Sequence, residues 1–352
     1  MKKVLCIALA LMMVFAMVAA CGNGGSSNDG PMYISVISKG FQHQFWQAVK
    51  QGSDQAAADL GVEIYFDGPE GESAIADQVN MLNAELAKNP DAIALAALDT
   101  TAVLSQLAEA YDKGIPVIGF DSGVPDAPAG QIAANASTNN EGAAALAADH
   151  MFPEIKAAVE AATPDNPVVI CILSQEVVSA SVGGRTKGFA EKMFTLASGA
   201  NDSVAITGGY SAINKGDANA AVKIEVVVGA TPDLTDMTNA ANTVLNTENL
   251  LGVFMSNEGA VSGLLAAHNA GASIPSGVLL IGFDAGEAQK SAVRSGLFFG
   301  AITQDPVQIG YQAVALAVKA ANGEPVSDID TGAKWYDSSN MDQADIAILL
   351  YD

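Results

Sequence analysis

Positive charge is scarce in this sequence. Its 352 residues include 16 lysines and arginines against 39 aspartates and glutamates, which gives a formal net charge of −23 at pH 7. Such a surface repels the phosphates of DNA and RNA, whose binding depends on lysine and arginine contacts. The composition therefore argues against a nucleic-acid-binding protein.

Cysteine is scarce too, with three residues in the chain. Cys6 lies in an apolar N-terminal segment, Cys21 follows that segment directly, and Cys171 lies in the apolar run VVICIL. If the N-terminal segment is removed, Cys171 is the one cysteine within the expected fold, so no disulfide can form there. Its apolar neighbours are typical of a small buried core residue.

The sequence also lacks the motifs of several enzyme classes. It has no G-x-S-x-G, S-x-x-K or H-E-x-x-H pattern and no P-loop, so zinc chemistry and nucleotide chemistry have no support. The three histidines, His43, His150 and His268, are far apart in the sequence. We expect a protein that is not an enzyme and that needs no cofactor and no metal ion.

The N-terminus has the layout of a secretory signal. Lys2 and Lys3 precede an uncharged apolar run, residues 4–20, that ends in small residues before Cys21. The run has 17 residues, fewer than the roughly 20 that a membrane-spanning helix needs. We therefore expect residues 1–20 to be a signal peptide.

The stretch VAAC at residues 18–21 resembles the lipobox of bacterial lipoproteins. The resemblance implies that Cys21 is lipidated and anchors the mature chain on the extracytoplasmic side of the bacterial cell membrane. The residues that follow, GNGGSSNDGP, are polar and rich in glycine, which is typical of a flexible segment. Residues 21–31 are therefore expected to form a lipidated tether.

Short apolar strands alternate with helical patterns from Tyr33 onward. Phe45, Val49, Ala56 and Leu60 are expected on one face of the first helix. Strand, helix and strand at this spacing predict βαβ units and parallel sheets. The pattern occurs as two series, so the fold class expected is α/β with two doubly wound lobes. The clearest strands are YISVIS, VEIYFDG, DAIALAAL and IPVIGFD in the first series, and PVVICIL, VKIEVVV, LGVFMS, VLLIGFD and LFFGAI in the second.

Two segments do not fit the alternation. The pattern pauses around residues 133–140, between the two series. Residues 197–221 are expected to be a loop, because they show neither strand nor helix periodicity.

The same short motif, Gly-Phe-Asp-x-Gly, ends a strand in each series, at Asp121 and Asp284. Ligands of open parallel sheets bind beyond the carboxyl ends of the strands, where these two carboxylates are expected. Alternatively, each aspartate caps a following helix. Their matching places, each with a glycine two residues later that would permit a tight turn, favour a shared cleft.

Several segments together resemble one family, the type I periplasmic sugar-binding proteins of ABC transporters, in particular the ribose-binding branch. The resemblance covers residues 32–325 approximately. It depends on the segments ISVISKGFQHQFWQAVKQG, GIPVIGFDS, RTKGF, FMSNEGAVSGLLAA, LIGFDAGEAQKSAV and GAITQDPVQIGYQAV.

The resemblance implies two lobes joined by three hinge strands, with a sugar enclosed between them. The N-terminal lobe would comprise residues 32–137 and about 305–334, and the C-terminal lobe residues 138–304 and about 335–352. We expect a monomer that delivers its solute to the permease and ATPase subunits of an importer.

The resemblance also implies roles for individual residues. Aromatic side chains would cover the sugar faces, carboxylates would accept hydroxyl hydrogen bonds, and amides and cations would complete a polar ring, which is the chemistry that a monosaccharide requires. The ligand-binding candidates are Lys39, His43, Phe45, Trp46, Asp121, Arg185, Asn257, Asp284 and Gln304.

Each of these candidates also has a purely structural interpretation. Arg185, one of two arginines in the chain, could form a surface ion pair. Asn257 could cap a helix, Gln304 could hold a turn, and His43 could be solvated. Of the adjacent aromatic residues at positions 45 and 46, one is expected to pack in the core and the other to reach the cleft.

The sequence departs from the ribose-binding pattern at three positions. Ser122 and Gly183 stand where arginines are usual, and His43 replaces an asparagine. These departures argue against ribose itself. The position of Lys39 resembles the pattern of the branch that binds autoinducer-2, whereas the segment MSNEG resembles that of the sugar-binding proteins. We expect a monosaccharide or a close relative of one.

Other functions remain as alternatives. A ligand-sensing subunit of a membrane receptor would use the same lobe closure as a transport protein. Paired carboxylates about 5–10 Å apart can also hydrolyse glycosides, so the pair Asp121 and Asp284 leaves a glycoside hydrolase open. A transcriptional regulator of this fold would need a DNA-reading helix-turn-helix before the first lobe, where the sequence has the signal and tether.

Overall fold

The computed structural model describes residues 30–41 and 43–351. Met1–Pro31 and Met32–Asp352 are separate units of the chain, and the fold below is that of the second. The expected signal peptide, most of the tether and Cys21 lie outside the described residues. In the described part of the chain, none of the helices has both the length and the apolar character that a membrane crossing requires.

The first lobe is built on a parallel sheet. Its helices cover both faces, with α2 (Gln44–Leu60) and α10 (Pro306–Ala321) on one and α3 (Ile75–Ala87) and α4 (Leu104–Asp112) on the other. Within the described residues this sheet has six strands, in the order β12 (Ile329–Asp330), β5 (Ala134–Ser137), β4 (Val117–Phe120), β3 (Ala92–Leu95), β1 (Tyr33–Ile37) and β2 (Glu63–Asp67).

The second lobe repeats this plan. Its seven described strands are parallel apart from β13, which runs antiparallel to β11. Their order is β13 (Ala333–Tyr336), β11 (Gly300–Gln304), β10 (Leu279–Phe283), β9 (Leu250–Met255), β6 (Val168–Ser174), β8 (Val222–Val228) and β7 (Val204–Gly208).

Helices cover both faces of the second sheet as well. One face packs against α5 (Asn140–Ala161) and α6 (Ala180–Ser198), and the other against α7 (Leu234–Leu245), α8 (Glu258–Asn269) and α9 (Glu287–Arg294). A short 3-10 helix, η1 (Ser211–Ile213), and the short α11 (Ala344–Ala347) complete the described elements. The expected fold class, two doubly wound α/β lobes, is confirmed.

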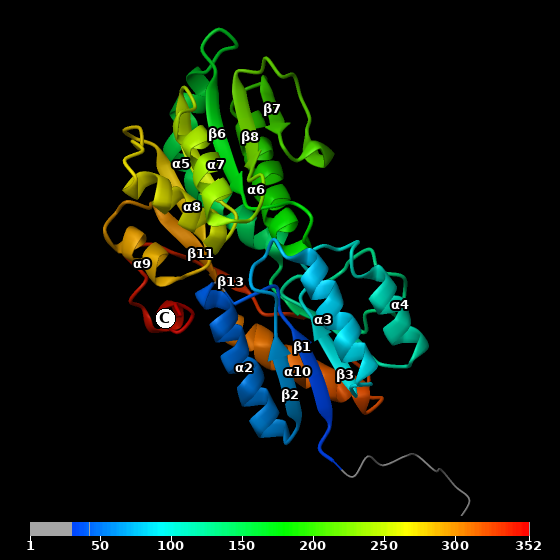
Figure 1. Ribbon diagram of the computed structural model, residues 1–352. Helices are drawn as coiled ribbons and strands as arrows, with labels where there is room; N and C mark the ends of the chain where they lie inside the picture. Colours follow the sequence, from blue (N-terminus) through cyan, green and yellow to red (C-terminus); the bar gives the residue numbers. More distant parts are fainter. Residues whose placement is uncertain (1–29, 42, 352) are drawn as a thin grey trace, which may run out of the picture. The chain divides into compact units, whose positions relative to one another are not determined.

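The chain crosses between the two sheets three times. It leaves the first sheet after β5, returns between β11 and α10, and leaves again between β12 and β13. Figure 1 shows the result: the orange helix α10, late in the sequence, lies beside the blue helix α2 near the start.

The contact between α2 and α10 depends on two glycines. A Cβ atom on Gly52 would collide with the carbonyl of Val307, and one on Gly310 with the carbonyl of Val49. The Ser53 hydroxyl donates to the Gly310 carbonyl at 3.3 Å. The absence of side chains at these two positions therefore lets the helix backbones approach closely.

Three sequence expectations about elements were wrong. Residues 134–137, where the pattern pauses, form β5; its sequence ANAS has small side chains that give no strand signal. The expected loop at 197–221 contains the edge strand β7. Leu60, expected on the buried face of α2, is 42% exposed, because it is the last residue of that helix.

Cys171 is buried and unpaired, as expected.

The strand order of both sheets marks where a ligand site is expected, at the carboxyl ends of the strands. In each sheet the strand order reverses at the first strand of its series, β1 in one and β6 in the other. Crevices of this kind, beyond the strand ends at a reversal of strand order, are where open α/β sheets bind ligands.

Candidate ligand-binding site

A cavity lies between the strand ends of the two lobes, with an empty volume of about 290 Å³, part of it open to solvent. The structure brings all nine sequence candidates together around it. The residues that line the cavity are Lys39, His43, Phe45, Trp46, Glu72, Asp121, Ser181, Val182, Arg185, Asn257, Glu258, Asp284 and Gln304.

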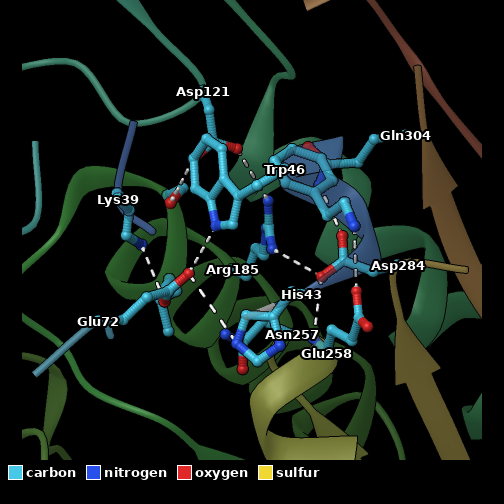
Figure 2. Close-up of a pocket in the computed structure, with 13 residues that line it drawn as sticks. Lys39, His43, Trp46, Glu72, Asp121, Arg185, Asn257, Glu258, Asp284 and Gln304 are labelled. Atoms are coloured by element: carbon cyan, nitrogen blue, oxygen red, sulfur yellow. Dashed lines mark hydrogen bonds and ion pairs between the residues drawn. The ribbon is translucent and has the colours of Figure 1, made fainter. Parts of the chain in front are cut away.

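Arg185 lies between the two repeated aspartates (Figure 2). Its guanidinium is 3.7 Å from Asp121 Oδ1 and 3.7 Å from Asp284 Oδ2. The group also lies 4.0 Å above the ring of Phe283, and its Nε donates to Asn140 Oδ1 at 2.8 Å. With 3% of its side chain exposed, Arg185 is not a surface residue. It is a buried counterion that two carboxylates share.

The two aspartates share an unusual backbone conformation. Asp121 has φ 50° and Asp284 has φ 81°, in the left-handed region that aspartate tolerates better than most residues do. This turn points both carboxylates to the cavity. The expected role of the following glycines was wrong, since Gly123 and Gly286 do not have positive φ. A Cβ on them would instead collide with Asn135 and Glu258 respectively.

Neither aspartate caps the helix that follows it in the chain. The N-cap of α9 is Gly286, and Asp121 is followed by bends and turns. Asp284 is instead held by two donors: Gln304 Nε2 at 2.7 Å from Oδ1, and the backbone N–H of Glu258 at 2.9 Å from Oδ2. The capping alternative is therefore wrong for both residues.

Asp121 is buried with long contacts to its donors. The Ser181 hydroxyl is 3.5 Å from its Oδ2, and Arg185 is 3.7 Å from Oδ1. Burial raises the pKa of Asp121 to about 6, although Arg185 and Lys39 favour its charged form. The carboxylate is therefore ionised at pH 7 and takes up a proton as the pH falls through about 6. Its hydrogen-bonding capacity is available to a ligand.

A third buried carboxylate, Glu72, was not among the candidates found in the sequence. It accepts hydrogen bonds from Trp46 Nε1 at 2.8 Å and Gln175 Nε2 at 3.2 Å, and it lies 3.8 Å from Lys39 Nζ. Burial opposes its charge, but Lys39, His43 and the Trp46 donor outweigh burial and lower its pKa. Glu72 follows β2, so the rule that selected Asp121 and Asp284, a carboxylate beyond a strand end, could have selected it.

Lys39 is buried at the end of β1 and joins several acidic groups. Its Nζ lies 3.8 Å from both Glu72 and Glu176 and donates to Ser179 Oγ at 3.3 Å. Burial opposes the charge of Lys39, but Glu72, Glu176 and Asp121 outweigh it and raise its pKa. The lysine is thus charged, with an ammonium at the cavity wall.

Phe45 and Trp46 both line the cavity, and both are buried in the core of the first lobe. Their rings meet edge to face, with centroids 5.0 Å apart and an interplanar angle of 84°. The expectation that one would pack and the other would reach the cleft was therefore wrong. In the first turn of a helix, side chains lean toward its N-terminus, and the N-terminus of α2 faces the cavity.

The remaining candidates have mixed roles. Asn257 caps α8 by accepting the Ala260 N–H at 3.1 Å, and its amide also donates to Gln175. Gln304 holds Asp284 rather than a turn, and its buried Oε1 has no hydrogen-bond partner among the described residues. His43 lies 4.0 Å from Glu72 with a side chain 12% exposed, so it is not a solvated surface residue.

The chemistry of the cavity groups can be compared with that of a metal site. Nowhere in residues 30–41 and 43–351 do three or more histidine, cysteine, aspartate or glutamate side chains gather as metal ligands would. The cavity groups are hydrogen-bond acceptors, two cations and aromatic rings. Such a set can hold a small polyhydroxylated molecule.

Two doubly wound lobes with a polar cavity at their facing strand ends define the class of two-lobed solute-binding proteins. The model of the family described as "Periplasmic binding protein domain" matches residues 34–325. The chain belongs to this family, and the resemblance noted in the sequence is confirmed.

Individual relatives agree with this assignment. The D-allose-binding periplasmic protein of Escherichia coli (strain K12) is 22% identical over 304 residues, which cover 84% of this chain and 86% of the relative. A solved structure from Brachyspira murdochii, named "ABC transporter, LacI family transcriptional regulator", is 41% identical with a TM-score of 0.76, over 92% of this chain and 99% of its own. A solute-binding protein from Agrobacterium vitis with bound D-fucose is 28% identical with a TM-score of 0.75, over 91% of this chain and 100% of its own.

Proposed function

We propose that the protein captures a monosaccharide or a sugar-like solute in the cavity and delivers it to an ABC importer. The observation that supports this most directly is the pair Asp121 and Asp284, two buried carboxylates on sister strands that share Arg185. Each carboxylate can accept two hydroxyl hydrogen bonds. The names of the relatives that bind D-allose and D-fucose support the same class of ligand.

Several lining residues beside the two aspartates have a role in this proposal. The rings of Phe45 and Trp46 cover the C–H face of the sugar. Lys39, Arg185 and His43 donate to hydroxyl and ring oxygens, and the free Oε1 of Gln304 accepts a hydroxyl. The role is binding without turnover, so a bound sugar would be recovered unchanged from the protein.

The cavity also selects by charge. The carboxylates of Glu72, Asp121, Glu258 and Asp284 line it, with Lys39 and Arg185 as permanent cations. An anionic sugar would add a further negative charge to a buried group of carboxylates, which is costly at low dielectric. Neutral sugars are therefore the expected ligands.

A thermal-shift screen tests the function. The chain from residue 22 on is heated with D-allose, D-fucose, D-arabinose, D-glucose and autoinducer-2, and D-glucuronate serves as the anionic match to D-glucose. A sugar at a hundred times its Kd adds about 2.7 kcal/mol of stability, so at least one neutral sugar is expected to raise the Tm while D-glucuronate leaves it unchanged. If mass spectrometry shows ligand-free protein and no sugar raises the Tm, the sugar proposal fails.

We also propose that Cys21 carries a lipid anchor after removal of residues 1–20 and that the protein works at the outer face of the cell membrane. Mass spectrometry of the N-terminal peptide from membranes is expected to find a diacylglyceryl group on Cys21, and Cys21→Ser is expected to release the protein from the membrane fraction. Retention of Cys21→Ser in washed membranes would contradict the anchor.

A sensor subunit that presents its loaded form to a receptor is the second candidate function. Co-purification of the protein with a permease and an ATPase would argue against this candidate.

A further inference from the structure

Helix α2 begins in the first lobe without a cap of its own. Its N-cap residue, His43, makes no side-chain capping hydrogen bond, and the first turn contains no acidic residue. The first N–H groups of a helix need acceptors, and a carboxylate is the most favourable one because of the helix dipole. That acceptor comes from the second lobe. The backbone N–H groups of Gln44 and Phe45 donate to Glu258 Oε1 at 3.3 Å and Oε2 at 3.4 Å.

The second lobe has a matching uncapped helix. The N-cap of α9, Gly286, has no side chain to offer. The first N–H of this helix, that of Glu287, donates to the side-chain oxygen of Gln44 at 2.8 Å. Gln44 therefore makes two contacts with the second lobe: its backbone N–H donates to Glu258, and its side-chain oxygen accepts the N–H of Glu287. Each lobe supplies the cap that a helix of the other lacks.

The geometry around Glu258 fixes this arrangement. Its own backbone N–H is held by Asp284 at 2.9 Å, so the residue is tied to one of the two strand-end carboxylates. A Cβ on Gly286 would collide with its carboxylate, so glycine at that position leaves room for it. Figure 2 shows Glu258 below Asp284, at the side of the cavity where His43 lies.

We propose that Gln44 and Glu258 form a reciprocal interlobe latch that holds the two lobes together over the cavity. The latch acts between protein groups, so it favours the closed arrangement before any ligand adds its own contacts. For a ligand that binds only the closed arrangement, the apparent Kd equals the Kd for the closed form divided by the fraction of molecules that are closed. The latch therefore strengthens binding by raising that fraction and slows release by opposing opening. Its effect on affinity rests on the proposed binding function, whereas its effect on closure does not.

The first experiment needs no sugar. Spin labels are attached at Asp59→Cys and Asn239→Cys, two exposed positions on α2 and α7, and interlobe distances are measured by pulsed electron resonance. Gln44→Ala, Glu258→Gln, Glu258→Ala and the pair Gln44→Ala with Glu258→Ala are each expected to shift the distribution toward longer distances, most strongly in the double variant. Matched controls are Gln47→Ala and Glu248→Gln, both exposed in the same lobes, and these should leave the distribution unchanged.

The second experiment uses the first neutral sugar of the screen that binds, with tryptophan fluorescence as the signal, since Trp46 lines the cavity. The bonds to Glu258 are long, at 3.3 and 3.4 Å, and the bond to the Gln44 side chain is between neutral groups, so each is weaker than an ideal charge-assisted hydrogen bond. Each single variant is therefore expected to release the sugar about tenfold faster, with little change in the association rate. Circular dichroism establishes that each variant is folded. Unchanged distances in the sugar-free double variant would overturn the latch, whatever the sugar result. If no sugar binds, the proposed function fails while the distances still decide the latch.

Discussion

Asp284→Ala is expected to abolish sugar binding, with a loss of affinity of at least 100-fold. The substitution removes the carboxylate that we propose accepts two sugar hydroxyls, each in a charge-assisted hydrogen bond that contributes about 1.5–3 kcal/mol. It also leaves Gln304 Nε2 and the Glu258 N–H without the acceptor that holds them. Isothermal titration calorimetry with a sugar that raises the Tm of the parent protein measures the loss.

Asp121→Ala provides a contrast within the same pair. This variant is expected to lose binding to a similar extent but to keep its stability, because the contacts of Asp121 to Ser181 and Arg185 are long and Arg185 still has Asp284. Asp165→Ala, at an exposed position of the second lobe, is the control and should bind normally. Normal affinity in a folded Asp121→Ala or Asp284→Ala variant would refute the idea that the two carboxylates form the centre of the site.

Arg185→Met is expected to cost stability as well as binding. Removing one partner of a buried charge group leaves the others uncompensated, at a cost of about 3–5 kcal/mol. Arg185 lowers the pKa of Asp121, which burial has raised to about 6, so the variant raises that pKa further. A carboxyl group with a raised folded-state pKa contributes less stability as the pH increases. The deficit should therefore be smaller at pH 5 than at pH 7.5, as measured by urea unfolding.

The second arginine of the chain supplies the control. Arg294 pairs with Asp342 at 3.2 Å on the surface, where the two side chains are 58% and 84% exposed. Exposed pairs contribute about 0–1 kcal/mol, so Arg294→Met should change stability little at either pH. Equal losses for Arg185→Met and Arg294→Met, or a deficit at Arg185 that grows at pH 5, would contradict the shared-counterion interpretation.

The sequence alone was sufficient for the fold class because strand and helix periodicities alternate clearly. The candidate residues around the cavity could be found for two reasons. A carboxylate beyond a strand end has a defined place in a parallel sheet, and the family resemblance supplied the rest. Glu72 and Glu258 were missed because their roles depend on partners more than 25 or 200 residues away in the sequence, such as Trp46 for one and Gln44 for the other.

The backbone conformation at the repeated Gly-Phe-Asp-x-Gly motif could not be predicted from the sequence either. A glycine two residues after each aspartate suggests that the glycine makes the turn, yet the aspartates take the left-handed conformation and the glycines make room for neighbours. The short strands β5 and β7 give no clear periodic signal in the sequence. They form strands because they pair with the neighbouring strands β4 and β8 of their sheets.

The three crossings between the sheets determine the order in which the parts of each lobe are synthesised. Residues leave the ribosome from the N-terminus, so the first five strands of the first lobe, β1 to β5, emerge long before α10. Ile309, Ala313 and Val314 of α10 belong to the core of that same lobe. Nearly all of the second lobe is made in the interval, yet β13, which pairs with β11, comes after α10. Neither lobe exists as a contiguous stretch of chain: the first sheet gains its strand β12, and the second its strand β13, only after the chain has crossed between them.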